Sequence, residues 1–184
     1  MSRWKPCWKG EWDALLIETI FDTLNAKAAI RAAELSMEKT GRKVPLMLSV
    51  TVSDIAGRTL SGQTLDAFLA SVEHADLFSA GLNCSFGARQ LKPFLEQLAS
   101  RAPYYISAYP NAGLPNSLGQ YDQTPEDMAA EVRSISKKAG KYYRRMLWYD
   151  GAIHCQVSGF DTRSTASCAC EEACAFVVVG IGVA

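Results

Sequence analysis

The stretch from Leu77 to Leu98 reads LFSAGLNCSFGARQLKPFLEQL and contains a strand, a polar turn and a helix in immediate succession. Leu77 to Leu82 is a short, mostly apolar run of the length that predicts a buried strand. The helix is predicted from the i, i+3, i+4, i+7 spacing of its apolar residues: Leu91, Phe94, Leu95 and Leu98. Asn83 and Cys84 stand between the two elements, at the carboxyl end of the strand.

The same unit recurs on both sides of this stretch. Further buried strands are predicted at Ala14 to Ile17, Leu46 to Val52 and Tyr104 to Ala108. A helix that follows Phe21-Asp22 and stops near Gly41 is predicted to turn one apolar stripe inward, formed by Leu24, Ala28, Ala32 and Leu35. A second helix is predicted from the stripe Leu65, Phe68, Leu69 and Val72.

A last helix is predicted to open at Thr124-Pro125, with a Thr cap, proline at the first position and acidic residues in the first turn. Its inner stripe would be Met128, Val132 and Ile135. Four strand–helix units in a row predict a parallel sheet with right-handed crossovers. Periodicity alone leaves two folds open, a doubly wound sheet and part of a (β/α)8 barrel.

Polar residues directly follow each predicted strand, and they help to choose between the two folds. They are Glu18-Thr19, Ser53-Asp54, Asn83-Cys84 and Asn111. Both folds bind ligands at the carboxyl ends of their strands. No Gly-x-Gly-x-x-Gly follows any strand, which disfavours the dinucleotide-binding version. The predicted fold class is therefore α/β, as a partial TIM (β/α)8 barrel.

Charge and hydropathy exclude several classes of function. The chain has 184 residues, enough for one domain, and its 19 basic residues balance 19 acidic ones. This balance provides no electrostatic attraction for nucleic acid or an anionic membrane. The longest apolar run, Ala173 to Ala184, is too short to span a bilayer, and no apolar signal segment follows the N-terminus. We expect a cytoplasmic protein that contacts neither nucleic acid nor membrane.

Three side chains at strand ends are candidates for chemistry, and each has a plainer alternative. Cys84 offers a nucleophile or a soft metal ligand, or is a buried structural cysteine. Glu18 offers a grip for an ammonium group, or ends its strand in solvent. Asn111 offers amide donors to a substrate carboxylate, or stabilises a turn in a stretch rich in Pro, Asn and Gly. His74 and His154 have no ligand or triad partner in sequence and receive no role.

Five segments, in order along the chain, resemble the homocysteine-binding S-methyltransferase domain of the cobalamin-dependent methionine synthase family. They are Asp13 to Lys27, Gly57 to Thr64, Gly81 to Cys84, Pro110 to Asn116 and Gly119 to Pro125. Methyltransferases that use betaine or S-methylmethionine share the barrel and the Asn-Cys pair. The Thr-Leu-Ser-Gly-Gln-Thr and Leu-Gly-x-Tyr-Asp pieces are more similar to the cobalamin-dependent branch. The resemblance assigns this chain roughly to strand 4 through helix 7 of the barrel.

The resemblance also implies a mechanism and roles for residues. In the family, zinc held by three cysteine thiolates binds the homocysteine sulfur, and the resulting thiolate takes the methyl group of methylcobalamin. Cobalamin and folate are bound by other domains of the full-length enzyme. By this resemblance Cys84 is the first zinc ligand, Glu18 holds the homocysteine amino group, and Asn83 and Asn111 line the pocket.

The family's other two zinc cysteines lie in a Gly-Gly-Cys-Cys-Gly-Thr-Thr segment on the last strand, and this sequence has no such segment. Cys168, Cys170 and Cys174 are no substitute, because they form no adjacent pair and lack the glycine turns. Catalytic zinc needs three protein ligands, so we expect the chain alone to be inactive. Three alternatives stay open: a non-catalytic homocysteine-binding or interaction module that uses Glu18 and Asn111, a cobalamin-independent methyltransferase fragment, and an unrelated zinc protein that uses the tail cysteines.

Both ends break the pattern, which divides the chain into residues 1–12, a partial barrel over 13–135, and residues 136–184. We interpret the two ends as DNA translated out of frame. Synonymous codons can be chosen for Lys141 to Asp150 that, read one base later, encode Asn-Ile-Ile followed by Gly-Gly-Cys-Cys-Gly-Thr-Thr, the missing zinc segment. Such a tail is not expected to pack on the sheet. Four strands would then leave two unpaired edges and favour aggregation.

Overall fold

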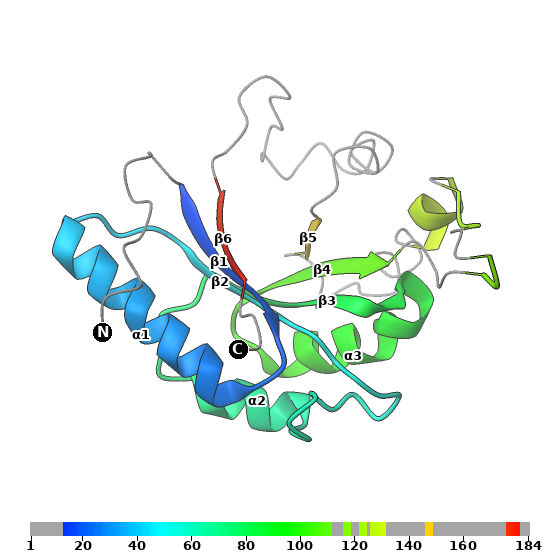
Figure 1. Ribbon diagram of the computed structural model, residues 1–184, viewed down its shortest axis with the longest axis horizontal. Helices are drawn as coiled ribbons and strands as arrows, with labels where there is room; N and C mark the ends of the chain where they lie inside the picture. Colours follow the sequence, from blue (N-terminus) through cyan, green and yellow to red (C-terminus); the bar gives the residue numbers. More distant parts are fainter. Residues whose placement is uncertain are drawn as a thin grey trace.

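The computed structural model describes residues 13–111, 116–118, 122–124, 126–131, 146–148 and 176–180. The described strands form one parallel sheet in the order β5-β4-β3-β2-β1-β6 (Figure 1). The elements run in chain order as β1 (Ala14–Ile20), α1 (Thr23–Thr40), β2 (Leu46–Val50), α2 (Leu65–Val72), β3 (Ser79–Gly87), α3 (Ala88–Arg101), β4 (Tyr105–Asn111), β5 (Met146–Trp148) and β6 (Phe176–Gly180).

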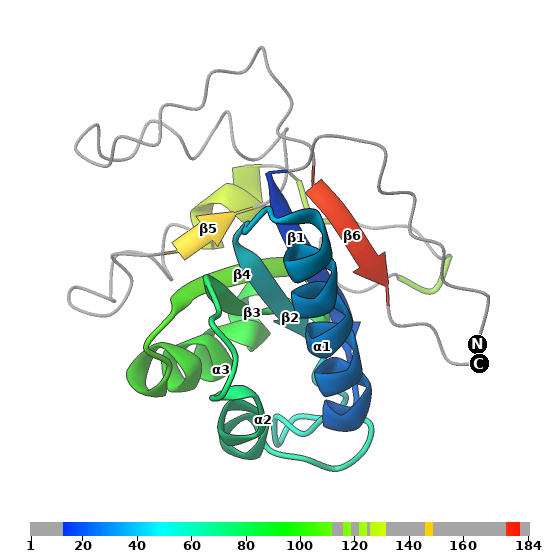
Figure 2. The same ribbon diagram turned by 90° about the vertical axis from the view of Figure 1, so that its left-hand side faces the viewer.

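The winding of the sheet favours one of the two folds that periodicity left open. Strands β1 to β4 are neighbours in chain order, and every pairing between them is parallel. Helices α1, α2 and α3 all cover the same face of the sheet (Figure 2). A doubly wound sheet reverses its strand order and carries helices on both faces. The singly wound arrangement is consistent with a partial (β/α)8 barrel, as predicted.

The edges of the four central strands are paired, so the expectation of two unpaired edges was wrong. Strand β5 pairs with β4 and β6 pairs with β1, both in parallel. An edge strand presents a row of free N–H and C=O groups that any extended segment of high β propensity can join. Residues 176–180 read Phe-Val-Val-Val-Gly and have that propensity. The remaining tail residues, with their four cysteines, lie outside the described residues, as does Cys7.

Three of the four predicted strands reach further than their apolar runs. Strand β1 continues to Ile20, β3 to Gly87 and β4 to Asn111, because parallel pairing carries on past the last apolar residue. The polar residues predicted to follow these three strands therefore belong to them, whereas β2 ends at Val50, before the predicted Val52, and Ser53-Asp54 lies outside it. At the last predicted helix, residues 126–131 are helical and the backbone N–H of Asp127 donates to Thr124 Oγ1 at 3.2 Å. The Thr cap is thus confirmed, whereas Val132 and Ile135 lie outside the described residues.

The inward stripes of α2 and α3 are confirmed, with Leu69 and Phe94 half-buried at their margins. The stripe predicted for α1 was wrong. Leu24 is 74% and Leu35 47% exposed, and Ala28 and Ala32 are exposed as well. The buried face consists of Thr23, Ala26, Ile30 and Ala33.

Both stripes of α1 consist mainly of apolar residues at helical spacing, so periodicity could not separate them. The observed stripe sets Ile30 between two alanines, which lets the helix approach the sheet closely while one large side chain fills the core. Asp22 fixes the start of the helix, because its carboxylate accepts from the backbone N–H of Asn25 at 2.9 Å.

The main core lies between the helices and the sheet. Its largest members are fully buried, and each such side chain contributes about 1.5–3 kcal/mol to stability. They include Leu15, Ile17, Ile30, Leu48, Phe68, Leu82, Leu91, Leu95 and Leu98. On the other face of the sheet a small apolar cluster of Ala14, Leu16 and Met47 is accompanied by buried polar residues of β2, β3 and β4.

Candidate functional site

The predicted site residues lie at the carboxyl ends of three parallel strands. Glu18 belongs to β1, Asn83 and Cys84 to β3, and Asn111 to β4. Strands β3 and β4 are direct neighbours, and their last paired residues are Gly87 and Asn111. Parallel strands end at one edge of a sheet, so these residues share the edge at which β1, β3 and β4 end (Figure 1). Sequence reasoning placed all four residues at this edge.

Asn83 is the centre of the polar contacts at this edge, and only 1% of it is exposed. Its Oδ1 accepts from Ser49 Oγ at 2.9 Å and from Thr51 Oγ1 at 3.2 Å. Its Nδ2 donates to Thr19 Oγ1 at 3.0 Å and to Cys84 Sγ at 3.2 Å. The carboxamide has two donor hydrogens and two acceptor positions, so all four are used within the protein.

The backbone around Asn83 is strained on two strands. Thr19, Cys84 and Ser85 have φ values of 61°, 57° and 62°, in the left-handed region that residues other than glycine rarely adopt. The register shifts at the same places, between Ile17 and Ile20 in β1 and between Asn83 and Gly87 in β3. Each such residue costs about 1–3 kcal/mol and persists only where its surroundings hold it. Strain of this kind clusters at binding and catalytic sites.

Glu18 and Asn111 are half-buried, as is the free thiol of Cys84. Neither Glu18 nor Asn111 has a side-chain hydrogen bond to another residue in the described parts of the chain. A carboxylate and an amide at the same edge, both open to a ligand, fit a zwitterionic amino acid. The carboxylate can accept from its ammonium group, and the amide can donate to its carboxylate.

Zinc does not fit the residues that are described. Among them no group of three or more His, Cys, Asp or Glu side chains is arranged to hold a metal ion. Cys84 is the one cysteine in the described ranges, and a catalytic zinc site needs three protein ligands. His74 is exposed just after α2, and His154 lies outside the described residues.

The sequence did not point to Ser49 and Thr51. A signal was present, because Leu-Met-Leu-Ser-Val-Thr-Val over residues 46–52 contains two hydroxyls in an otherwise apolar strand. Residues two apart in an extended segment lie on the same face, so the pattern places both hydroxyls on one face. Their partner Asn83, more than 30 residues later, could not be foreseen from this pattern.

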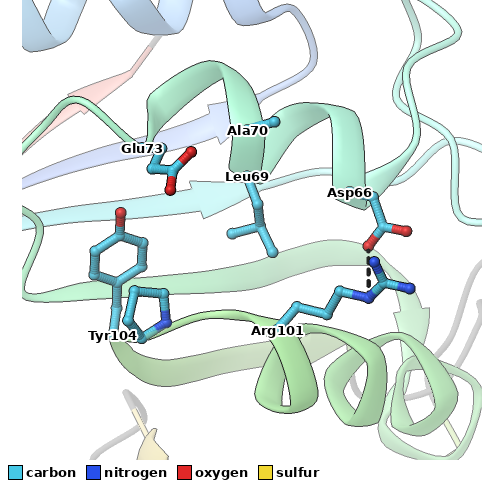
Figure 3. Close-up of a pocket in the computed structure, with 7 residues that line it drawn as sticks. Asp66, Leu69, Ala70, Glu73, Arg101 and Tyr104 are labelled. Carbon is cyan, nitrogen blue, oxygen red and sulfur yellow. Dashed lines mark ion pairs between the residues drawn. The ribbon is translucent and has the colours of Figure 1, made fainter.

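A cavity of about 220 Å³ lies elsewhere, between α2 and α3 on the helix side of the sheet (Figure 3). Asp66 and Arg101 form an ion pair at one end, with 3.4 Å between Oδ1 and Nε. Tyr104 and Glu73 lie at the other end (Figure 3). Partial burial, and next the negative charge of Glu73, raise the pKa of Tyr104 above its ordinary value of 10.0. None of the predicted site residues lines this cavity.

None of the helices in the described ranges is both long and apolar enough to cross a membrane.

The family of the chain follows from a direct comparison. Over residues 2–158, which is most of its length, the chain matches the family model described as homocysteine S-methyltransferase. The match extends beyond residues 13–135 on both sides. The strand-end edge with Glu18, Asn83, Cys84 and Asn111 lies within it, and the chain belongs to the homocysteine S-methyltransferase family.

Proposed function

We propose that the strand-end edge binds homocysteine, as part of the homocysteine-binding domain of a cobalamin-dependent methionine synthase. The observation that carries this proposal is that Glu18, Cys84 and Asn111 share the carboxyl edge of the sheet, beside a strained, hydrogen-bonded backbone. Glu18 accepts from the homocysteine ammonium group. Asn111 donates to its carboxylate, and Cys84 lies beside its sulfur.

The assignment to the cobalamin-dependent branch is supported by the Gly57 to Thr64 segment. This segment is hydrogen-bonded to Phe21, the residue directly after β1. Ser61 donates to the carbonyl oxygen of Phe21 from both its backbone N–H, at 3.2 Å, and its hydroxyl, at 3.0 Å. Thr59, within the same segment, is buried. The segment that distinguishes this branch is thus attached to the strand that carries Glu18. Cobalamin and folate would be bound by further domains, in the cytoplasm.

We propose that the chain in its present form does not transfer methyl groups, because the described residues do not make up a zinc site. The missing cysteine pair is proposed to lie out of frame over Met146 to Trp148. The position of these residues supports this idea. They form β5, directly beside β4, and Leu147 and Trp148 pair with Ser107 and Ala108. In the resemblance β4 corresponds to strand 7, so β5 occupies the place of the last strand.

Calorimetric titration of the full chain with L-homocysteine, under a non-thiol reductant, tests the binding function. We expect saturable binding, weakened at least about tenfold by Glu18→Gln, because the variant loses a charge-assisted hydrogen bond. Glu96→Gln is the matched control, since Glu96 is an exposed carboxylate on α3, away from the strand ends. Absence of binding, or equal affinity of the Glu18→Gln variant, would contradict the proposal.

Resequencing the coding DNA tests the frame. One of the two shifted frames after residue 135 is expected to encode Gly-Gly-Cys-Cys-Gly-Thr-Thr; without that segment in either frame, the frame hypothesis is wrong. The frame-restored chain is expected to bind one equivalent of zinc by metal analysis, and Cys84→Ser is expected to abolish it. Zinc bound by the present chain and lost only with Cys168, Cys170 and Cys174 replaced would identify an unrelated zinc protein instead.

A non-catalytic homocysteine-binding module is the second candidate, and the lack of a metal cluster among the described residues favours it. It predicts the same result in the homocysteine titration but a different result in an assay of methionine formation. If the frame-restored chain binds homocysteine and zinc yet produces no methionine from methylcobalamin, the module is favoured. Methionine formed from betaine or S-methylmethionine would instead assign the chain to the cobalamin-independent branch.

A further inference from the structure

Two hydroxyl groups, one in β2 and one on the residue directly after it, converge on one atom of Asn83. Ser49 Oγ and Thr51 Oγ1 both donate to Oδ1, at 2.9 and 3.2 Å. Ser49 is 5% exposed and pairs in register with Gly81, two residues before Asn83. Between the two hydroxyls, Val50 turns to the helix-side core and is fully buried. The two donors therefore flank a fully buried residue, in a segment that has little freedom to move.

The two hydroxyls determine which way the carboxamide points. With Oδ1 held against β2, Nδ2 is directed toward Thr19 on one side and Cys84 on the other. Both of its hydrogens are then used within the protein, and no donor of Asn83 is left for a ligand. This arrangement differs from the direct substrate contact that the resemblance implies for Asn83.

We propose that Ser49 and Thr51 are positioning residues, which act through Asn83 to hold Thr19 and Cys84 in their strained conformations at the homocysteine site. Asn83 bonds to the side chains of two residues with positive φ, one on β1 and one on β3. It thereby joins the register shifts of both strands across β2, which lies between them. Asn83 itself orients the thiol of Cys84 and does not touch the substrate.

The energies are consistent with this role. Four net hydrogen bonds through one amide are comparable in free energy with the cost of holding two or three residues in strained conformations. Loss of one hydroxyl would leave a buried Oδ1 lone pair unsatisfied and free the amide to reorient. The backbone at Thr19 and Cys84 would then relax, and the neighbouring Glu18 would shift with it.

The chain allows a test that removes the hydroxyl and little else. Thr51→Val keeps the shape of the side chain, whereas Thr51→Ser keeps the hydroxyl; Ser49→Ala removes the second donor. Ser71→Ala is the matched control, because the Ser71 hydroxyl donates to Ala67 O within α2, outside the site. The first readout is the side-chain amide signals of Asn83 in 15N NMR of the full chain.

The wild-type chain and Thr51→Ser are expected to show two Asn83 amide hydrogens that exchange with water far more slowly than those of the exposed Asn25. Thr51→Val and Ser49→Ala are expected to lose this protection at an unchanged fold, judged by the backbone spectrum. Unchanged protection in both variants, or no protection in the wild type, overturns the proposal. This readout needs no ligand.

The second readout rests on the proposed homocysteine binding. The dissociation constant is expected to rise about fivefold to tenfold in Thr51→Val, as for one lost hydrogen bond, and to be restored in Thr51→Ser. Ser71→Ala is expected to bind like the wild type. Equal affinities of Thr51→Val and Thr51→Ser would overturn the link to binding. If the wild type does not bind homocysteine, the proposed function fails, while the amide signals still decide whether Ser49 and Thr51 position Asn83.

Discussion

The backbone of Gly81 on β3 lies so close to Ser107 on β4 that a methyl group at Gly81 would overlap both the hydroxyl and the carbonyl oxygen of Ser107. The two residues are register partners, and Ser49 pairs with Gly81 from the other side. Three small residues thus lie side by side across β2, β3 and β4. Gly81 is two residues before Asn83, and this row of small residues lies on the face of the sheet opposite the helices.

Gly81→Ala is expected to destabilise the fold by about 3 kcal/mol or more, as overpacking in a rigid region does. The overlap involves backbone as well as side chain, so β3 or β4 must move. Urea denaturation measures the loss. Gly41→Ala is the control, because Gly41 has a positive φ of 67° but no atom lies within 4 Å of the added methyl group. It is expected to cost only the conformational strain, about 1–2 kcal/mol.

A second substitution sharpens this prediction. Because Ser107 O overlaps the new methyl group as well as Ser107 Oγ, Ser107→Gly is not expected to rescue Gly81→Ala. Full recovery of the urea midpoint in the double variant would mean that the hydroxyl alone limits the approach of the two strands.

The orientation of α1 is tested by two neighbouring faces of the same helix. Ile30 is 1% exposed, so Ile30→Ala is expected to cost about 2–4 kcal/mol through lost burial and a cavity. Leu24 is 74% exposed, so Leu24→Ala is expected to change stability by less than about 0.5 kcal/mol. Thermal or urea unfolding checks both. The opposite order would restore the stripe that the sequence predicted.

The N-terminus of α1 depends on Asp22. Its carboxylate accepts from the backbone N–H of Asn25 at 2.9 Å. Asp22→Ala is expected to lower the free energy of unfolding by about 1 kcal/mol, because one helix N–H group loses its partner. Asp22→Asn retains a capping oxygen and is expected to keep most of that stability. Equal losses in the two variants would show that the negative charge, rather than the capping bond, stabilises the helix start.

The pKa of Tyr104 is raised, first by burial and second by the negative charge of Glu73. Glu73→Gln is expected to lower this pKa while leaving it above 10.0, because burial remains the larger cause. The tyrosinate absorbance during a pH titration measures it, with Tyr104→Phe subtracted to remove the other tyrosines. No change on Glu73→Gln would show that burial accounts for the whole shift.

The same group makes stability depend on alkaline pH. The folded-state pKa of Tyr104 lies above the unfolded value of 10.0, so its contribution is fully present below about pH 10. That contribution is lost as the pH rises through the folded-state pKa, because the folded chain then holds a tyrosinate in an unfavourable place. Tyr104→Phe is expected to remove this loss. Unfolding curves of both chains at several alkaline pH values check the prediction.

Local patterns in the sequence were sufficient for much of the fold and for the position of the site. The periods of α2 and α3 identified their buried stripes, because each helix has only one apolar face. The polar residues that end β1, β3 and β4 marked the carboxyl edge, since parallel strands bring such residues together whatever their exact register. Glu18, Cys84 and Asn111 were therefore found without a structure. The roles assigned to them remain predictions.

The sequence by itself thus determined the strand–helix alternation, the edge that carries the site and the motifs by which the chain resembles its family. Only the tertiary structure decided which stripe of α1 is buried, that β5 and β6 pair with the outer strands, and that Ser49 and Thr51 hold Asn83. The physical reason is the range of the interactions. Periodicity and turn chemistry act within a few residues, whereas the hydroxyls of Ser49 and Thr51 meet an amide more than 30 residues away only once the strands are in register.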